Sequence, residues 1–240
     1  MENQFTRTEL LLGEDAMKRL RAARVVVFGV GGVGGYVVEV LARSGVGTIA
    51  MVDPDRVNLS NLNRQIVALH STVGRLKVEV MAERIRDINP DCEVQTFPLF
   101  YLPENADEID LSQYDYVVDC IDTVKAKMEI IRRCHRQQIP VISSMGAANK
   151  LDPTAFRVCD IAKTSMDPLA KVIRKTLRKE GIYHFNVVYS EEASVQELGS
   201  KESGVSSQRG EKRPLPSCAF VPAACGLVVG GEVVRNLAGV

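Results

Sequence analysis

A glycine-rich segment near the start of the chain has the spacing of a phosphate-binding turn. Gly29, Gly31 and Gly34 satisfy the pattern G-x-G-x-x-G between a short β-branched run and a stretch with helical apolar spacing, and Gly32 lies within the turn. Such a turn lets backbone N–H groups approach phosphate oxygens at the positive end of the following helix. The four glycines therefore predict a nucleotide-binding site without identifying the nucleotide.

Polar side chains after the next apolar run extend this predicted site. Asp53 stands at the end of that run, where a carboxylate can bind ribose hydroxyls, and Asp55 follows it in the segment "MVDPDRVNLSNLNRQ". The further side chains expected to contact the nucleotide are Asn61, Arg64, Gln65 and Lys77.

Two of these side chains bear on whether the nucleotide is cleaved. Breaking the bond between the α and β phosphates places negative charge on the equatorial oxygens and on the leaving pyrophosphate, and fixed cations lower that barrier. Arg64 and Lys77 are placed for this role, so we predict that ATP is consumed. A hydride carrier keeps its pyrophosphate intact and needs no such cluster. An NAD-binding oxidoreductase or a nucleotide sensor, with both cations merely solvated, stays an alternative.

Two carboxylates at the end of a later apolar run could hold a metal ion. Asp119 and Asp122 lie in the segment "YDYVVDCIDTVKAK", and carboxylates suit a magnesium ion that bridges phosphates. We predict Asp122 as the magnesium ligand and as a contributor to catalysis. The alternative is that Asp122 only caps the helix that follows.

Alternating elements must position these residues. Strands are expected at 24–28, 48–52, 92–97, 114–120 and 141–145, and helices at 74–89 and 124–137, besides the helix that follows the glycine turn. Strands that alternate with helices form a mostly parallel sheet. The predicted fold class is α/β, a Rossmann-like sheet with helices on both faces, extended by a smaller C-terminal substrate-binding half.

The composition changes after Asn149. We expect a strand near 156–159 and then a helix with Asp167 as its N-cap, Pro168 at its first position and Gly181 at its end. The apolar face of this helix is expected to consist of Leu169, Val172, Ile173 and Leu177.

The chain therefore divides into two predicted portions. Residues 1–150 form an ATP-binding portion with an N-terminal arm, and residues 151–240 form a substrate portion. A mobile crossover loop is expected at about 196–217, because this Gly-, Ser- and charge-rich stretch has no periodicity. A final strand and a helix that ends near Leu237 follow it.

A basic stripe on the predicted helix after Asp167 could contact nucleic-acid phosphates. Its members, together with flanking cations, are Lys163, Lys171, Arg174, Lys175, Arg178, Lys179, Lys212 and Arg213. Such contacts would make binding strongly dependent on salt. The simpler interpretation is a solvated helix face.

The overall composition limits which classes of protein this chain can belong to. Thirty basic and thirty acidic residues give no net charge, so the total alone does not require a nucleic-acid partner. We expect a cytoplasmic protein without a membrane span, because no signal sequence opens the chain and the longest apolar run, 219–231, is too short. The six cysteines form no CxxC pair, so no zinc site is expected.

The motifs together resemble those of a known family. The elements G-V-G-G-V-G, D-P-D-x-V-x-x-S-N-L-N-R-Q, Lys77 and D-C-I-D are similar to those of the ubiquitin-activating, ThiF/MoeB/HesA-type adenylyltransferases. The resemblance implies ATP, magnesium and a homodimer. It also implies that Arg7, in "QFTRTELLLGEDAM", reaches into the partner's site as a catalytic residue. Gly35 departs from the family pattern, in which serine is common, but a backbone turn needs no hydroxyl.

The C-terminal segments narrow the resemblance to one branch. The segments "GAANKLDPTAFRVCDIAKTSMDPLAKVIRKTLRKEGI" and "VVYSEE" are similar to those of tRNA threonylcarbamoyladenosine dehydratases. That branch implies a tRNA substrate, helper proteins of a sulfur relay, and ATP-dependent ring closure through an acyl adenylate without an enzyme thiol. The alternative is adenylylation of the C-terminal carboxylate of a ubiquitin-like sulfur-carrier protein, for which Cys218 is the thiol at the edge of the predicted loop.

Overall fold

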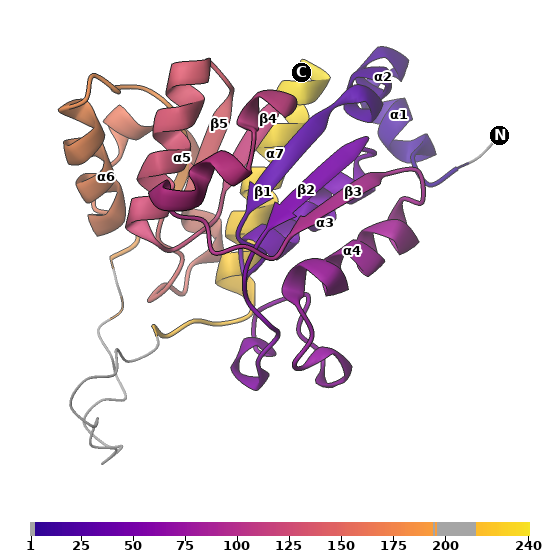
Figure 1. The fold of residues 1–240 in the computed structure, drawn as a ribbon, viewed down its shortest axis with the longest axis horizontal. Coiled ribbons are helices and arrows are strands. Elements are labelled where there is room, and N and C mark those ends of the chain that lie inside the picture. The colour runs from indigo at the N-terminus through magenta and orange to yellow at the C-terminus, as the bar shows by residue number, and fades with distance from the viewer. Residues whose placement is uncertain (1–2, 194, 196–214) are drawn as a thin grey trace.

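One seven-stranded sheet organises the chain, in the order β3-β2-β1-β4-β5-β7-β6 (Figure 1). The computed structural model describes residues 3–193, 195 and 215–240. All neighbouring strands pair in parallel except β6 and β7, which pair antiparallel. The strands are β1 (Arg24–Phe28), β2 (Thr48–Val52), β3 (Glu93–Phe97), β4 (Tyr116–Asp119), β5 (Val141–Ser144), β6 (Phe156–Asp160) and β7 (Asn186–Ser190).

Helices cover both faces of the sheet. The α-helices are α1 (Thr6–Leu12), α2 (Glu14–Ala22), α3 (Gly34–Arg43), α4 (Lys77–Ile88), α5 (Val124–Gln137), α6 (Pro168–Arg178) and α7 (Phe220–Ala238). Short 3-10 helices are η1 (Leu59–Asn61), η2 (His70–Thr72), η3 (Pro103–Glu108), η4 (Leu111–Gln113), η5 (Pro153–Ala155) and η6 (Ile161–Lys163). One core lies between the sheet and α2, α3, α4 and α7, and two further clusters pack against α5 and α6. The predicted fold class is confirmed.

Most predicted elements are present, with shifted ends. The strands at 24–28 and 48–52 and the helix at 124–137 have the predicted bounds. The helix predicted from residue 74 begins at Lys77. The prediction missed β7, and the final strand expected after the crossover loop is wrong, because residues 215–219 contain no strand and α7 begins at Phe220. Most of that predicted loop, residues 196–214, lies outside the described residues.

The helix after Asp167 has the predicted start. The Asp167 carboxylate accepts the Ala170 N–H at 2.9 Å, which satisfies one of the free donors of the first turn. The predicted role of Gly181 is also confirmed: the last helical residue is Arg178, and Gly181 ends the turn that follows with a left-handed φ of +82°. The Ile182 N–H donates to the Leu177 carbonyl at 3.0 Å, as in a glycine-capped helix end. The predicted apolar face is wrong in part. Val172 is 51% exposed, whereas Ala170, Ile173 and Leu177 are fully buried.

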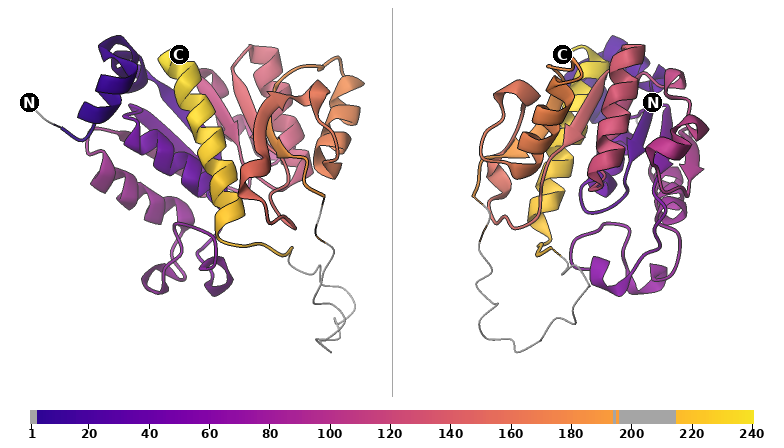
Figure 2. Two further views of the ribbon diagram at one scale, coloured as in Figure 1. Left: turned by 180° about the vertical axis from the view of Figure 1, so that it is seen from behind. Right: turned by 60° about the vertical axis from the view of Figure 1, so that its left-hand side comes forward.

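The last helix, α7, lies directly on α3 (Figure 2). A Cβ added at Gly226 would stand 2.3 Å from the Val33 carbonyl oxygen, and one at Gly230 would stand 2.8 Å from Val40 Cβ. The helix has a mean hydropathy of 1.3 over an 18-residue window, which meets the length and composition of a membrane span, although 44% of that window is buried. The apolar helix is therefore longer than the run at 219–231 that the sequence analysis counted. The packing of α7 on α3 is that of a core helix.

A buried ion pair joins β4, β5 and α5 beneath the carboxyl edge of the sheet. Lys127 Nζ lies 2.9 Å from an Asp119 carboxylate oxygen and 3.3 Å from Ser143 Oγ, and Ser143 Oγ donates to the same carboxylate at 2.5 Å. Asp119 and Ser143 are fully buried and Lys127 is 1% exposed. Removing one partner of such a pair leaves a buried charge without compensation.

We predict that Lys127→Met lowers the free energy of unfolding by about 3–5 kcal/mol, because Asp119 would lose its counter-charge. Urea unfolding monitored by circular dichroism measures the change. Lys125→Met, on the exposed side of the same helix, is the control and should change stability by less than about 0.5 kcal/mol. Adding Asp119→Asn to Lys127→Met should recover part of the loss; equal stability of the Lys127→Met variant and the wild-type protein contradicts the assignment.

Candidate functional site

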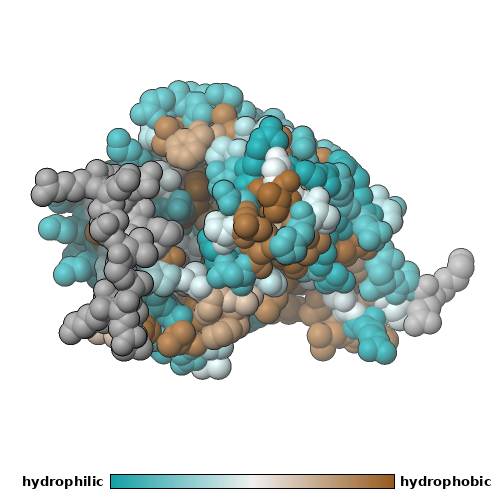
Figure 3. Space-filling model, turned by 90° about the horizontal axis from the view of Figure 1, so that it is seen from below, coloured by the Kyte–Doolittle hydropathy of each residue, from teal (hydrophilic) through white to brown (hydrophobic). Residues whose placement is uncertain are grey.

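A cavity of about 860 Å³ opens at the carboxyl edge of the sheet. Figure 3 views the molecule from the side of this edge and shows a patch of hydrophobic surface with hydrophilic surface around it. The cavity is lined by the glycine turn, by the ends of β2, β4 and β5, and by the start of α6. The sequence-predicted residues on its wall are Gly29, Gly31, Gly32, Asp53, Asp55, Asn61, Arg64, Gln65, Lys77 and Asp122.

The glycine turn is closed so tightly that side chains are excluded at Gly29 and Gly34. A Cβ at Gly34 would stand 1.8 Å from the Gly29 carbonyl oxygen, and Gly29 itself has a φ of +87°. Gly34 is buried and does not reach the cavity wall, so its contribution is this close approach. A Cβ at Gly35 would lie 2.9 Å from Ile66 Cγ2. Packing against Ile66 thus gives a physical reason for the departure from serine.

Asp53 ties the glycine turn to the end of β2. Its two carboxylate oxygens accept the Val30 N–H at 2.7 Å and the Asp55 N–H at 2.9 Å. Burial raises the pKa of Asp53, and the opposing effects of Lys77 and of the two N–H donors do not cancel that rise. The carboxylate therefore acts first as a structural acceptor, and its remaining lone pairs are the ones available to a ribose.

Lys77 is a buried cation at the first residue of α4. Its side chain is 5% exposed, and Nζ lies 2.7 Å from an Asp55 oxygen and 3.9 Å from an Asp53 oxygen. Its backbone N–H donates to the Asp55 carbonyl at 3.0 Å. A lysine is unfavourable at a helix N-terminus, so the two carboxylates compensate its charge. The ammonium is thereby fixed at the cavity wall, where it can bind an anion.

Arg64 lies over the glycine turn. Its guanidinium donates to the Ser60 carbonyl at 3.0 Å and to Asn63 Oδ1 at 2.9 Å, and its Cγ would be 3.5 Å from a Cβ at Gly32. The neighbouring Gln65 has a buried Oε1 without a hydrogen-bond partner among the described residues. A buried acceptor without a donor is rare in native proteins, which indicates that this wall receives a polar ligand.

The two carboxylates after β4 have different environments. Asp122 is exposed and lines the cavity, as a magnesium ligand requires. Asp119 does not line it, and Lys127 and Ser143 already occupy its carboxylate. The interpretation of Asp119 as suited to magnesium is therefore wrong.

The other half of the cavity is formed by residues that the sequence analysis did not assign to the site. They are residues 144–150, Met166, Asp167, Glu192 and Leu215. The backbone is left-handed at Asn149 (φ +58°) and at Met166 (φ +59°), and such conformations of non-glycine residues concentrate at ligand sites. The sequence does contain an indication of these residues. Residues 144–150 lie at the carboxyl end of β5, and the carboxyl ends of neighbouring parallel strands meet at one edge of the sheet.

The comparisons with known proteins agree with this geometry. Residues 5–240 match the ThiF family. The chain belongs to the ThiF family. It is 46% identical over 245 residues to a Bacillus subtilis protein named tRNA threonylcarbamoyladenosine dehydratase, covering 99% of this chain and 95% of that protein. An Escherichia coli protein of the same name is 44% identical over 74% of this chain and 66% of its own length.

A solved structure extends the match in three dimensions. The E. coli tRNA threonylcarbamoyladenosine dehydratase in complex with ATP superimposes with a TM-score of 0.87 at 36% identity, covering 98% of this chain and 94% of that chain. The family resemblance drawn from the motifs is confirmed. By contrast, a Gracilaria tenuistipitata protein named probable molybdopterin-synthase adenylyltransferase is 36% identical over 52% of this chain and 35% of its own length.

Burial makes two cysteines of this ThiF-family chain poorly suited to nucleophilic attack. Burial raises the pKa of Cys120, which lines the cavity, to about 12, and it raises the pKa of the Cys92 thiol to about 11. The thiolate is the nucleophilic form of cysteine. Cys218 packs partly against the core and is not on the cavity wall. Within the described residues, no group of three His, Cys, Asp or Glu side chains could hold a metal ion by itself.

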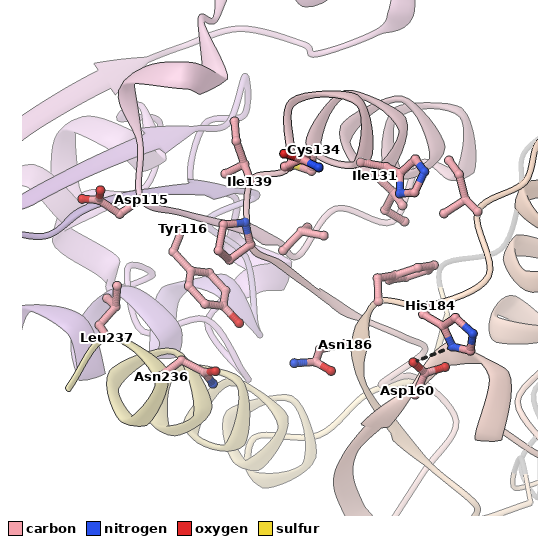
Figure 4. Close-up of a pocket in the computed structure, with 16 residues that line it drawn as sticks. Asp115, Tyr116, Ile131, Cys134, Ile139, Asp160, His184, Asn186, Asn236 and Leu237 are labelled. Atoms are coloured by element: carbon pink, nitrogen blue, oxygen red, sulfur yellow. Dashed lines mark hydrogen bonds and ion pairs between the residues drawn. The ribbon is translucent and has the colours of Figure 1, made fainter. Parts of the chain in front are cut away.

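A second cavity, of about 640 Å³, opens at the opposite edge of the sheet. Figure 4 shows Tyr116 and Asn186 on its walls and the pair of Asp160 and His184, whose carboxylate and ring nitrogen are 3.1 Å apart. None of the sequence-predicted site residues lines it. The nucleotide site predicted for the ThiF-family motifs therefore belongs to the larger cavity.

Two groups of predicted contacts lie away from the larger cavity. Arg7 is exposed on α1 and does not line it. In the predicted basic stripe, the half-buried Arg174 guanidinium donates to the Thr164 carbonyl at 2.9 Å, unlike the exposed members of the stripe. The exposed members are Lys163, Lys171, Lys175, Arg178 and Lys179, whereas Lys212 and Arg213 lie outside the described residues.

We predict that Gly34→Ala destabilises the fold by about 3 kcal/mol, because the new Cβ would collide with the Gly29 carbonyl. Gly31→Ala is the control, since its Cβ would stand 3.7 Å from Gln65 Nε2, an ordinary contact. Thermal unfolding of both variants measures the difference. Equal melting temperatures would show that the turn opens at no cost.

Proposed function

We propose that the protein catalyses the ATP-dependent dehydration of threonylcarbamoyladenosine in tRNA. The observation that carries the proposal is one cavity in which the glycine turn, Arg64 and Lys77 face a second half formed by residues 144–150 and the start of α6. Such a cavity holds a triphosphate beside the carboxylate that it activates. The 46% identity over nearly the whole chain to a dehydratase supports this substrate.

In the first step, the threonyl carboxylate attacks the α-phosphate of ATP and pyrophosphate leaves. Arg64 and Lys77 stabilise the charge on the phosphate oxygens, and the glycine-turn N–H groups bind the phosphates. Asp53 and Asp55 contact the ribose, and Asn61 and Gln65 complete the polar wall. Asp122 is the carboxylate that would hold magnesium, which binds proteins through one or two carboxylates together with substrate phosphates. Bound there, magnesium would neutralise phosphate charge.

In the second step, the carbamoyl group of the same nucleotide attacks the activated carbonyl and AMP leaves. One water is lost overall and a ring forms. Because the second nucleophile belongs to the substrate, proximity replaces a covalent enzyme intermediate. The raised pKa of Cys120 agrees with a route without a thiol, and we do not propose the sulfur-carrier alternative.

The tRNA itself needs a binding surface outside the cavity. The four exposed cations of α6 and of its C-terminal turn, Lys171, Lys175, Arg178 and Lys179, provide one that leads away from the cavity edge. We also propose that residues 1–150 form the ATP-binding portion and that residues 151–240 form the substrate portion. We place the protein in the cytoplasm, where tRNA is found. Helper proteins of a sulfur relay stay an expectation from the resemblance.

A homodimer completes the proposal. Leu10 and Leu11 on α1 are 83% and 82% exposed, and Phe220 and Leu227 on α7 are 50% and 51% exposed. Exposed apolar side chains on two helices provide area that a second copy could bury. Arg7 lies on the same short helix as the two leucines, so a partner that covers α1 would also receive its guanidinium.

Mass spectrometry of nucleosides tests the proposed reaction. Transfer RNA that carries threonylcarbamoyladenosine is incubated with the protein and ATP, then digested. The expected product has lost one water, and pyrophosphate release should depend on that tRNA. Release provoked instead by a carrier protein that ends in Gly-Gly would replace the proposal with the sulfur-carrier reaction.

We expect Arg64→Ala and Lys77→Ala each to lower the rate of pyrophosphate release by about 100-fold, the usual loss on removing one contact to transition-state charge. Arg56→Ala is a matched control, because Arg56 is exposed in the same segment and donates to the Gly74 carbonyl outside the cavity. Rates within about twofold of wild type in both cavity variants would remove these cations from the mechanism.

Mixed dimers test the placement of Arg7. Arg7→Ala and Asp122→Asn proteins should each be nearly inactive alone, whereas a mixed dimer contains one site with both native residues and should regain activity. Mixing differently tagged subunits, isolating the mixed species and assaying pyrophosphate release gives the answer. Absence of rescue in isolated mixed dimers argues that Arg7 does not act across subunits.

A further inference from the structure

Asp167 is a buried carboxylate in the wall of the cavity, in the half opposite the phosphate-binding turn. It is 5% exposed and precedes Pro168, the first residue of α6. One oxygen, Oδ1, caps the helix by accepting the Ala170 N–H at 2.9 Å. This hydrogen bond fixes the carboxylate in one orientation, because rotating the side chain would break its bond to the first turn of the helix.

The second oxygen of Asp167 is available to a ligand. Among the described residues no side chain or backbone group donates to Oδ2, and a Cβ at Gly146 would lie 3.7 Å from it. Gly146 follows β5 and also lines the cavity. Met166, directly before Asp167, has the left-handed φ of +59°, so the fold tolerates backbone strain at the residue that presents this carboxylate.

The other charged groups described in this half are already engaged. The Glu192 oxygens accept the Leu151 N–H at 2.8 Å and the Asp152 N–H at 3.0 Å. Lys150 Nζ donates to the carbonyls of Ser190 and Glu192. Of the carboxylates that the structure describes on this part of the cavity wall, Asp167 is the one with an oxygen that accepts no hydrogen bond from the described residues.

The second step of the proposed reaction requires a proton acceptor. Whether nitrogen or oxygen of the carbamoyl group attacks the acyl adenylate, the group must lose an N–H proton to give the neutral ring. A positioned general base contributes about 10²–10⁴-fold to such a step. Arg64 and Lys77 are cations and cannot accept this proton, and Asp122 is the carboxylate already assigned to magnesium.

We propose that Asp167 is the general base of ring closure, an inference that rests on the proposed function. Oδ2 accepts the carbamoyl N–H proton as the carbamoyl atom forms its bond to the carbonyl carbon. The bond between that carbon and the phosphate oxygen breaks, and its electron pair leaves with AMP. The protonated Asp167 then returns its proton to solvent. Oδ1 keeps its bond to the Ala170 N–H throughout, so α6 stays capped.

Asp167→Asn separates the two steps. Asparagine keeps the volume and the N-cap bond but accepts protons poorly. We expect ATP–pyrophosphate exchange that depends on threonylcarbamoyl-tRNA to stay within about threefold of wild type, whereas single-turnover ring closure falls by about 100-fold or more. The KM for tRNA should be unchanged. Asp110→Asn, which alters the cap of an exposed 3-10 helix outside the cavity, should leave both steps intact.

A second variant distinguishes a base from a cap. Asp167→Glu keeps a carboxylate but is a poorer N-cap, so it should be less stable than Asp167→Asn and yet close the ring faster. The reverse order of ring-closure rates would show a purely structural role and overturn the proposal. So would wild-type ring closure by Asp167→Asn, or parallel loss of exchange and closure in that variant. If wild-type protein shows no exchange with this tRNA, the proposed function fails instead, independently of Asp167.

Discussion

The site depends on the hydrogen bonds of one buried carboxylate. Asp53 accepts the Val30 N–H from the glycine turn and the Asp55 N–H from the segment after β2. Asp55 in turn holds the Lys77 ammonium at 2.7 Å. The turn that we propose to bind phosphate and the Lys77 ammonium are therefore positioned through the same side chain. The burial of Asp53 has a cost, which is reflected in its raised pKa.

The sequence was sufficient for elements in which local pattern and packing agree. The β1 and β2 strands are apolar runs buried on both faces of a parallel sheet, and their bounds were predicted correctly. The β7 strand was missed because its pairing with β5 and with antiparallel β6 depends on contacts distant in sequence. Leu169 and Val172 were assigned to the buried face of α6, but helical spacing does not determine where that face ends.

Side-chain direction limited the prediction of the site. Asp119 and Asp122 are the same residue type three positions apart, and only the fold shows that one pairs with Lys127 and the other faces the cavity. The hydrogen bond of Arg174 could not be predicted for the same reason, because its partner Thr164 lies before the helix. Asp167 was recognised as a cap, yet its second oxygen could be placed beside Gly146 only in three dimensions.

The close contact of Gly226 with the Val33 carbonyl joins the last helix of the chain to the start of α3. Nearly two hundred residues separate the two partners in sequence, so this contact forms late on a growing polypeptide. During synthesis on the ribosome, the glycine turn has its supporting helix only after residues 220–238 have left the exit tunnel. A product truncated before residue 220 would lack the helix that packs against the start of α3 beside the glycine turn.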